Sequence, residues 1–453
     1  MRIRALFVCV LVAATLPARP GAAAACDGVL CAGAASGVIT PPVTTPMWGY
    51  TARQAVLFTA SGVEEHLGAA AERLGQGDPA GAAAEAGKLA DEPVVKDKTS
   101  ADTELYAKEF VANRGIHLRL QANAFVLRGA NGVKVAVVQT DLGGVPGEVH
   151  QAVVNRIAAA GVDRDHLLIG ATHTHQGPGG IFQYQGYALL GGDEFDPRVF
   201  EAVVAGITGA VLRADARLAP ARLGWKTVPL PGANRNRRVT RQWCANPESQ
   251  CDPDFQPTPD SPPRTDQDAI VIRVDTTGGL PLGVIVNYAA HGTIGGDGNL
   301  LFSGDNQGWA TRLVVDGIRK EAGPLPQGHE IVDALVNGAQ GDVSPVGSGY
   351  NDYSEMEDAG LRQAVPVLRA WRDLAGSLRG DVTVDARFEF LCFCGQEVSE
   401  DFVYRGPALD MVDPAWDRVA PYAALGHGGV TADDGTSLPV PLPAQGHKAP
   451  VLA

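Results

Sequence analysis

The sequence has 453 residues, of which 45% are hydrophobic and 19% are charged, so it can form one large globular domain or several ordinary ones. The formal net charge of −14 argues against a nucleic-acid-binding protein, because phosphate contacts need a basic stripe that this sequence lacks. No stretch after the N-terminal region approaches the roughly 20 consecutive apolar residues of a membrane-spanning helix, so we expect no transmembrane segment.

The N-terminal residues 1–25 have the pattern of a secretory signal peptide: a short basic start, an apolar stretch and a run of small residues. We expect cleavage near Ala25 and a mature protein that is secreted or periplasmic. The alternative, a lipid anchor on Cys26, is less well supported, because "AAAC" lacks the branched apolar residue that a lipid-attachment site prefers.

The cysteine count also fits an exported protein. Seven cysteines are present, and removal of Cys9 with the signal leaves six, an even number that is typical of disulfide-bonded chains. The connectivity stays open; the closely spaced cysteines are Cys26 with Cys31, Cys244 with Cys251, and Cys392 with Cys394.

Residues 26–50 are predicted to be an extended N-terminal segment, rich in Pro and Thr toward its end. Residues 51–114 are Ala-rich, charged and weakly periodic, which predicts a helical insertion on the surface. Residues 244–266 are rich in Pro, Asp and Ser and are expected to form an exposed loop.

From residue 115 onward, strand-like and helix-like segments alternate, which predicts an α/β fold with mixed β-sheets flanked by helices in a single large catalytic domain over residues 115–453. The expected strands are 123–129, 133–141, 166–175, 222–228, 268–276, 283–291, 330–342 and 381–393. The expected helices are 146–161, 197–218, 306–323 and 357–376.

Polar side chains gather where the predicted strands end, and such strand ends are where α/β proteins collect their functional residues. The residues at these ends are Asp141, His173, His175, His291, Asp342 and Ser344. His173 and His175 lie two apart in an extended segment and therefore point the same way. Imidazole is a common zinc ligand, so a metal shared with His291 is one interpretation, and buried structural histidines are the other.

Three further groups have a chemical and a structural interpretation. Ser344 in "GAQGDVSPV" is a nucleophile, an oxyanion donor or a turn residue, and the segment lacks the G-x-S-x-G pattern of α/β-hydrolases. The arginines of "NRNRR" either orient a polar substrate group or form a solvated surface. Asp305 with Asn306 is typical of a helix N-cap, and Asp141 either supports a metal-bound histidine or forms a turn.

Taken in order, several motifs resemble those of the neutral, non-lysosomal ceramidase family. The matching segments are "VITPP", "MWGY", "GIHLRLQANAFVLRG", "QTDLGGVPGEVHQAV", "ATHTHQGPGG", "NRNRR", "NYAAHGT", "SGDNQGWA" and "GAQGDVSPV". The resemblance extends from about residue 37 to residue 385, apart from the inserted region between residues 50 and 115.

The resemblance implies a role for each matching residue. His173 and His291 would bind Zn²⁺, and His175 would contact the substrate amide or the developing oxyanion. Arg237 would orient the substrate, and Gly49 would line the site. Ser344 would be the nucleophile; alternatively a zinc-activated water attacks, and Ser344 positions the substrate or stabilises the oxyanion.

The sequence departs from the family pattern in three places. The family's remaining zinc ligands, a glutamate and a tyrosine, and its C-terminal β-sandwich are expected beyond residue 453, so residues 115–453 resemble a C-terminally incomplete catalytic domain. Two histidines alone make a poor zinc site, since catalytic zinc usually has three protein ligands. Val346 replaces the family's Asn, and the insertion at 51–114 lies close to the predicted substrate entrance.

The expected function is therefore that of an exported zinc-dependent amidohydrolase. It would cleave the N-acyl bond of ceramide, or of a related N-acyl sphingolipid at or from a membrane surface, to a fatty acid and a sphingoid base. Two alternatives stay open: a metallohydrolase of another amide or ester, and a catalytically inactive lipid-binding module that lacks the remaining zinc ligands.

Overall fold

The computed structural model describes most of the chain between residues 26 and 388. The described residues are 26–50, 54–88, 94–95, 105–183, 195–237, 265–347 and 353–388. Several predictions lie outside them: the signal peptide, the pairing of the four cysteines after residue 240, the loop at 244–266 and the region beyond residue 388.

An eight-stranded mixed sheet forms the centre of the molecule, in the order β14-β12-β11-β9-β1-β6-β7-β8. The two outermost pairs, β12 with β14 and β7 with β8, are parallel, and all other neighbours are antiparallel. Its strands are β1 (Cys31–Val38), β6 (Gln121–Arg128), β7 (Lys134–Thr140), β8 (Leu167–Ala171), β9 (Ala219–Pro229), β11 (Asp268–Thr276), β12 (Pro281–Tyr288) and β14 (Val332–Asn337).

The sheet folds back on itself, so that its two halves pack face to face. Strand β14 at one end of the order packs against β6 and β7 near the other end. The contact is close: a Cβ atom built on Gly170 of β8 would lie 2.8 Å from Val336 Cγ1 of β14. An apolar core that includes Phe125, Val274 and Ile285 fills the space between the halves. The fold therefore has two sheet layers at its centre.

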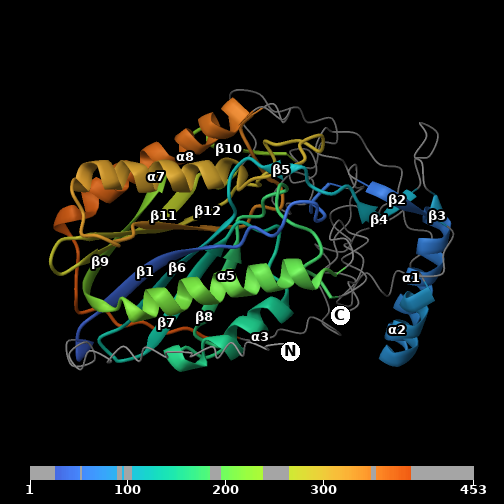
Figure 1. The fold of residues 1–453 in the computed structure, drawn as a ribbon, viewed down its shortest axis with the longest axis horizontal. Coiled ribbons are helices and arrows are strands. Elements are labelled where there is room, and N and C mark those ends of the chain that lie inside the picture. The colour runs from blue at the N-terminus through green and yellow to red at the C-terminus, as the bar shows by residue number, and fades with distance from the viewer. Residues whose placement is uncertain are drawn as a thin grey trace, which may run out of the picture.

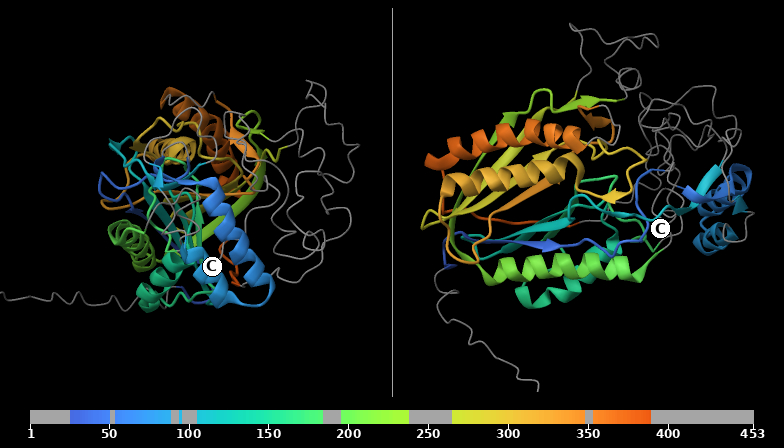
Figure 2. Two further views of the ribbon diagram at one scale, coloured as in Figure 1. Left: turned by 90° about the vertical axis from the view of Figure 1, so that its right-hand side faces the viewer. Right: turned by 45° about the horizontal axis from the view of Figure 1, so that its top comes forward.

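Helices cover the outer face of each layer (Figures 1 and 2). α3 (Gly147–Arg156) and α5 (Pro197–Ala216) cover β1, β6 and β7, whereas α7 (Asp305–Ala322) and α8 (Tyr353–Asp373) cover the half formed by β11, β12 and β14. α5 buries residues at spacings of three and four, namely Val199, Val203, Val204, Ile207, Ala210, Val211 and Ala214, which is the stripe of an amphipathic helix. The predicted class, mixed sheets flanked by helices, is confirmed.

Strand β1 gives part of residues 26–50 a place in the sheet that the sequence did not predict. The sequence predicted only an extended segment, but β1 lies in the middle of the sheet, between β9 and β6. The ordered layers therefore include residues that precede the predicted domain start at residue 115. Cys26 and Cys31, one of the closely spaced pairs in the sequence, form a disulfide at the first residue of this strand.

The region predicted as a helical insertion contains helices and strands. Its helices α1 (Ala60–Gly75) and α2 (Pro79–Gly87) lie beside a small sheet, in the order β3-β2-β4, that the sequence did not predict. The strands of this sheet are β2 (Gln54–Thr59), β3 (Val94–Val95) and β4 (Leu105–Phe110). Figure 1 shows these elements beyond one end of the large sheet, as does the right-hand view of Figure 2.

The predicted strand at 381–393 is wrong over its described part, because residues 381–388 have no regular secondary structure. Between the short helix η6 (Leu374–Gly376) and this segment, Arg379 makes an isolated bridge to Leu223 of β9. No helix among the described residues is long and apolar enough to cross a membrane. The short elements that remain are η4 (Ala158–Ala160), β5 (Gly115–Ile116) with β13 (Leu301–Phe302), and β10 (Asn234–Asn236) with β15 (Val343–Pro345).

Candidate metal centre and active site

The two sheet layers bring three histidines together at the carboxyl ends of their strands. His173 and His175 follow β8 in one layer, and His291 follows β12 in the other. The two loops meet in an isolated parallel bridge between Thr174 and Gly292. Strand ends from two layers thus converge on one place, as expected for an α/β protein.

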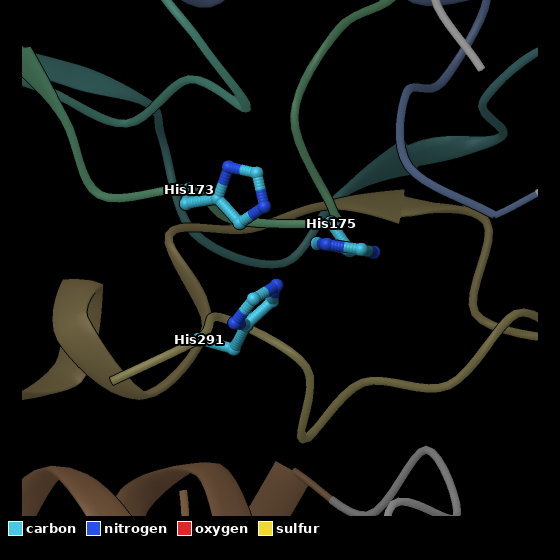
Figure 3. Close-up of side chains that lie close together, drawn as sticks. All are labelled: His173, His175 and His291. Atoms are coloured by element: carbon cyan, nitrogen blue, oxygen red, sulfur yellow. The ribbon is translucent and has the colours of Figure 1, made fainter. Parts of the chain in front are cut away.

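The three imidazoles surround a common space (Figure 3). The ring centroids are 4.5 Å apart for His173 and His291, 5.1 Å for His173 and His175, and 5.3 Å for His175 and His291. One ring nitrogen from each lies within 4.8 Å of the others. His175 and His291 are buried, and His173 is half-buried. This is the only group of three or more potential metal ligands within such a distance among the described residues.

Backbone carbonyls orient two of the rings. His173 Nδ1 lies 2.5 Å from the carbonyl oxygen of Gly143, and His291 Nδ1 lies 2.7 Å from that of Gln340. Because a carbonyl oxygen only accepts, each Nδ1 carries the proton and each Nε2 keeps its lone pair. Metal-binding histidines commonly have this arrangement. The donor set therefore fits a divalent ion that prefers imidazole, such as zinc.

Burial keeps His291 in the form that a metal requires. Desolvation, together with the nearby charge of Arg237 and the ring of His173, lowers the pKa of His291 to about 2. The ring is therefore neutral throughout the physiological pH range. Its Nε2 lone pair accepts a hydrogen bond from Arg237 Nη2 at 2.9 Å, so a metal at this nitrogen has to displace that guanidinium.

The end of β10 and a neighbouring loop hold Arg237. Its backbone N–H donates to the Asp342 carbonyl at 2.8 Å, and its Nη2 also donates to the Gly341 carbonyl at 3.0 Å. The structure thus places Arg237, as well as the three histidines, in one site. Arg235, two residues earlier, is exposed.

The segment Trp48–Gly49–Tyr50 forms a wall beside the histidines. The indole of Trp48 makes edge contacts with both His173 and His175, at centroid distances of 5.0 and 5.1 Å, and the Tyr50 ring lies 4.8 Å from that of His175. Gly49 has φ 109°, and a Cβ atom there would lie 2.8 Å from His175 Cγ. Only glycine fits this position without displacing His175.

Ser344 lies in β15 rather than in the predicted turn. It pairs with Arg235 of β10, and its neighbour Val343 accepts a hydrogen bond from the His291 backbone N–H at 2.9 Å. Ser344 is half-buried. The pairing of β15 with β10 therefore places Ser344 opposite a residue two positions before Arg237 and directly after Val343, whose carbonyl holds the His291 backbone.

Asp141 supports the site differently from either interpretation of the sequence. Its carboxylate accepts from the Gln121 N–H at 2.9 Å and from Gln139 Nε2 at 2.8 Å, whereas the ring of His173 is held by Gly143. Burial raises the pKa of Asp141 to about 6, although these two hydrogen bonds favour its ionised form. Asp141 thus fixes the start of the loop that carries Gly143.

Asp305 is not the N-cap of α7, since Gly304 has that position. Asp305 is fully buried with φ 54°, and its carboxylate accepts from the backbone N–H groups of Ile294 and Gly295, at 3.2 and 2.9 Å. It therefore fastens the loop after His291 to the start of α7. Non-glycine residues with positive φ cluster at functional sites, and His173, with φ 61°, is a second example here.

Sequence reasoning did not identify Trp48, Tyr50, Gly143 or Gln340 as parts of the site. In "MWGY" only Gly49 had an expected role, and in "QTDLGG" only Asp141. Two aromatic rings around a glycine, and a glycine pair after a strand, are weak signals by themselves, because their use depends on which loops meet in the fold.

The fold and the site define an α/β protein in which three histidines that are able to hold a metal ion meet at the carboxyl ends of the strands. Residues 99–359 match the model of the N-terminal part of the neutral/alkaline non-lysosomal ceramidases. The match covers more than half of the chain, and the chain belongs to this family.

Individual relatives agree with the family assignment. A neutral ceramidase of Pseudomonas aeruginosa is 32% identical over 349 residues, which cover 73% of this chain and 46% of the relative. A neutral ceramidase of Mycobacterium tuberculosis is 32% identical over 305 residues, which cover 63% of this chain and 45% of the relative. This chain thus spans about half the length of these relatives.

Solved structures confirm the fold. The crystal structure of the Pseudomonas aeruginosa neutral ceramidase superposes with a TM-score of 0.55 at 24% identity, over 77% of this chain and 46% of that one. A ceramidase complexed with C2 gives a TM-score of 0.54 at 25% identity, over 77% and 45% of the two chains.

Proposed function

We propose that this protein is the catalytic part of a zinc-dependent N-acyl amidohydrolase that cleaves ceramide or a related N-acyl sphingolipid to a fatty acid and a sphingoid base. The observation that carries the proposal is the meeting of His173, His175 and His291 at one sheet end of a ceramidase-family fold. The ceramidase names of the relatives support the substrate class.

The metal ligands in this proposal are His173 and His291, each through the Nε2 atom that its Nδ1–carbonyl hydrogen bond leaves available. Zinc held there would polarise the scissile amide carbonyl and lower the pKa of a water. His175 contacts the substrate amide or its developing oxyanion. Its ring is also within reach of the same ion, and a third imidazole would complete the three-ligand set of a catalytic zinc.

Arg237, which directly follows β10, and Ser344, which lies in the paired strand β15, act on the substrate. The guanidinium presents several N–H donors and orients the polar head group of the lipid. The Ser344 hydroxyl either attacks the amide carbon or donates to the oxyanion while water attacks. Gly49, with Trp48 and Tyr50 on either side of it, lines the approach to His175.

We also propose that the protein is exported and that its parts have separate roles. Residues 1–25 direct secretion, residues 51–114 are an insertion whose elements lie near the substrate entrance, and the domain that follows carries the chemistry. A disulfide between Cys26 and Cys31 is compatible with an oxidising compartment.

Turnover of a fluorescent ceramide by the full-length protein tests the proposal. We expect fatty-acid release that zinc chelation abolishes and that His173→Ala and His291→Ala reduce by at least about 100-fold. Undiminished turnover in His173→Ala would contradict the proposal. A panel of short acyl amides, assayed in parallel, separates ceramide hydrolysis from hydrolysis of another amide. A purified protein that contains no zinc and shows no turnover would favour a catalytically inactive lipid-binding module.

A further inference from the structure

We infer that Thr174 is a positioning residue: its buried hydroxyl locks the junction of the two histidine loops and so sets the spacing of the metal ligands. This inference rests on the proposed metal centre. It concerns the residue between the two histidines of the "HTH" block, to which the sequence comparison assigned no role.

The Thr174 hydroxyl ties its own loop to a segment distant in sequence. It donates to the Ser303 carbonyl at 2.8 Å and accepts from the Gln176 backbone N–H at 3.1 Å. The Ser303 N–H in turn donates to the Gln176 carbonyl at 3.1 Å. Thr174 has no solvent-exposed surface, so no water can replace these bonds if the hydroxyl is removed.

The backbone of Thr174 joins the two sheet layers at the same point. It forms the isolated bridge with Gly292, in which the His175 N–H donates to the Gly292 carbonyl at 2.8 Å. A Cβ atom on Gly292 would lie only 2.6 Å from Thr174 Cα, so the two backbone segments approach each other as closely as glycine permits. Gly292 directly follows His291, and Thr174 directly follows His173.

This contact bears on the metal geometry because His173 is held in an unfavourable conformation. Its φ of 61° is uncommon for a residue that is not glycine, and such conformations persist only where surrounding bonds impose them. On the C-terminal side of His173, the first residue that hydrogen bonds hold in place is Thr174. Loss of the hydroxyl bonds therefore lets the His173 loop relax away from His291, whose own backbone is held by Val343.

The chain supplies a matched control in Thr172. Thr172 lies on the other side of His173 and is equally inaccessible to solvent, and its hydroxyl has no hydrogen-bond partner among the described residues. Valine at position 172 or 174 preserves branching at Cβ and removes one hydroxyl. Only the change at 174 removes hydrogen bonds.

The test compares purified full-length Thr174→Val, Thr172→Val and wild-type protein. Zn²⁺ affinity is measured by competition with a chromophoric chelator, and ligand geometry by the visible absorption of the Co²⁺-loaded protein. We expect Thr174→Val to lose about 10- to 100-fold in affinity and to change its Co²⁺ spectrum, as for loss of a group that orients a ligand. Thr172→Val should match wild type, and Thr174→Ser, which keeps the hydroxyl, should restore affinity and spectrum.

Wild-type affinity and an unchanged spectrum in Thr174→Val would overturn the inference, as would an equal loss in Thr172→Val. If Thr174→Val does not fold, Thr174→Ser and Thr174→Ala replace it, since they differ only in the hydroxyl: a metal affinity lower in the alanine variant supports the inference, and equal affinities overturn it. A wild-type protein that binds no metal would contradict the proposed function itself.

Discussion

Arg237 and a metal ion compete for the same nitrogen, which leads to a prediction with a distinctive sign. The Arg237 Nη2 donates to His291 Nε2 at 2.9 Å, and the His291 proton is on Nδ1, bonded to Gln340. Nε2 has one lone pair, so it accepts from Arg237 or binds a metal, but not both. Arg237→Met should therefore tighten zinc binding, although it removes a group proposed to hold the substrate.

The size of the effect follows from the bond that the metal has to break. A hydrogen bond to a charged group contributes about 1.5–3 kcal/mol net. Since about 1.4 kcal/mol is a tenfold change in an equilibrium constant, removal of this competition predicts roughly 10- to 150-fold tighter zinc binding. The lower end is the better expectation, because Nη2 also donates to Gly341 and keeps that bond when it turns from His291.

The assay is chelator competition at fixed pH, with Arg235→Met as the control. Arg235 has the same charge and lies in β10, whereas Arg237 directly follows the last residue of this strand, and Arg235 is exposed. We expect Arg235→Met to leave zinc affinity near that of wild type. Unchanged or weaker zinc binding in Arg237→Met would refute competition for Nε2. In the same variant, ceramide turnover at saturating zinc should fall, mainly through a higher KM.

Three further predictions concern packing and burial. Gly49→Ala should displace His175 and destabilise the fold by about 1–3 kcal/mol in urea unfolding, because a non-glycine residue is strained at φ 109° and the new Cβ meets the imidazole; unfolding like wild type would contradict this. Gly143→Ala should move the Trp48 indole, whose ring carbons lie 2.1–2.5 Å from the Cβ position, and an unshifted tryptophan emission in this variant would speak against the close packing. Asp333→Asn should stabilise the protein at neutral pH by at least about 1 kcal/mol, because burial raises the pKa of Asp333 well above 3.8 and its carboxylate oxygens have no hydrogen-bond partner among the described residues. The pKa of Asp333 is higher in the folded than in the unfolded state, so the aspartate lowers the free energy of unfolding more and more as the pH rises above 3.8. The stability gained by Asp333→Asn should therefore shrink at mildly acidic pH. A gain in stability that is independent of pH would refute this explanation.

The helices and most large strands could be predicted because their apolar residues recur with a clear period. α5 is the best case, with a capping Asp196 and Pro197 at its start. β1 could not be predicted, since "CAGAASGV" has a single β-branched residue, Val38, and no aromatic one, whereas such residues are typical of strands. Its small residues have a tertiary reason: a Cβ atom on Gly33 would lie 2.0 Å from the Ala214 carbonyl oxygen of α5.

The site was predictable as a set of chemical groups but not as a geometry. His173, His175 and His291 stood out because they follow apolar strands. Their convergence depends on the folding of one sheet into two layers and on the bridge at Gly292, which no local pattern encodes. The same limit applies to Ser344, which local sequence placed in a turn and which strand pairing places opposite Arg235 of β10.

The most direct test of the central claim, a metal centre built from these histidines, is the zinc content of the purified full-length protein and its single-alanine variants, measured by mass spectrometry after dialysis against metal-free buffer. We predict about one zinc per chain in the wild type, as in other mononuclear catalytic sites, and loss of the metal in His173→Ala and His291→Ala. The His175→Ala variant decides whether His175 is a third ligand or contacts only the substrate. Wild-type protein without zinc, or His173→Ala and His291→Ala variants that retain it in full, would contradict the claim.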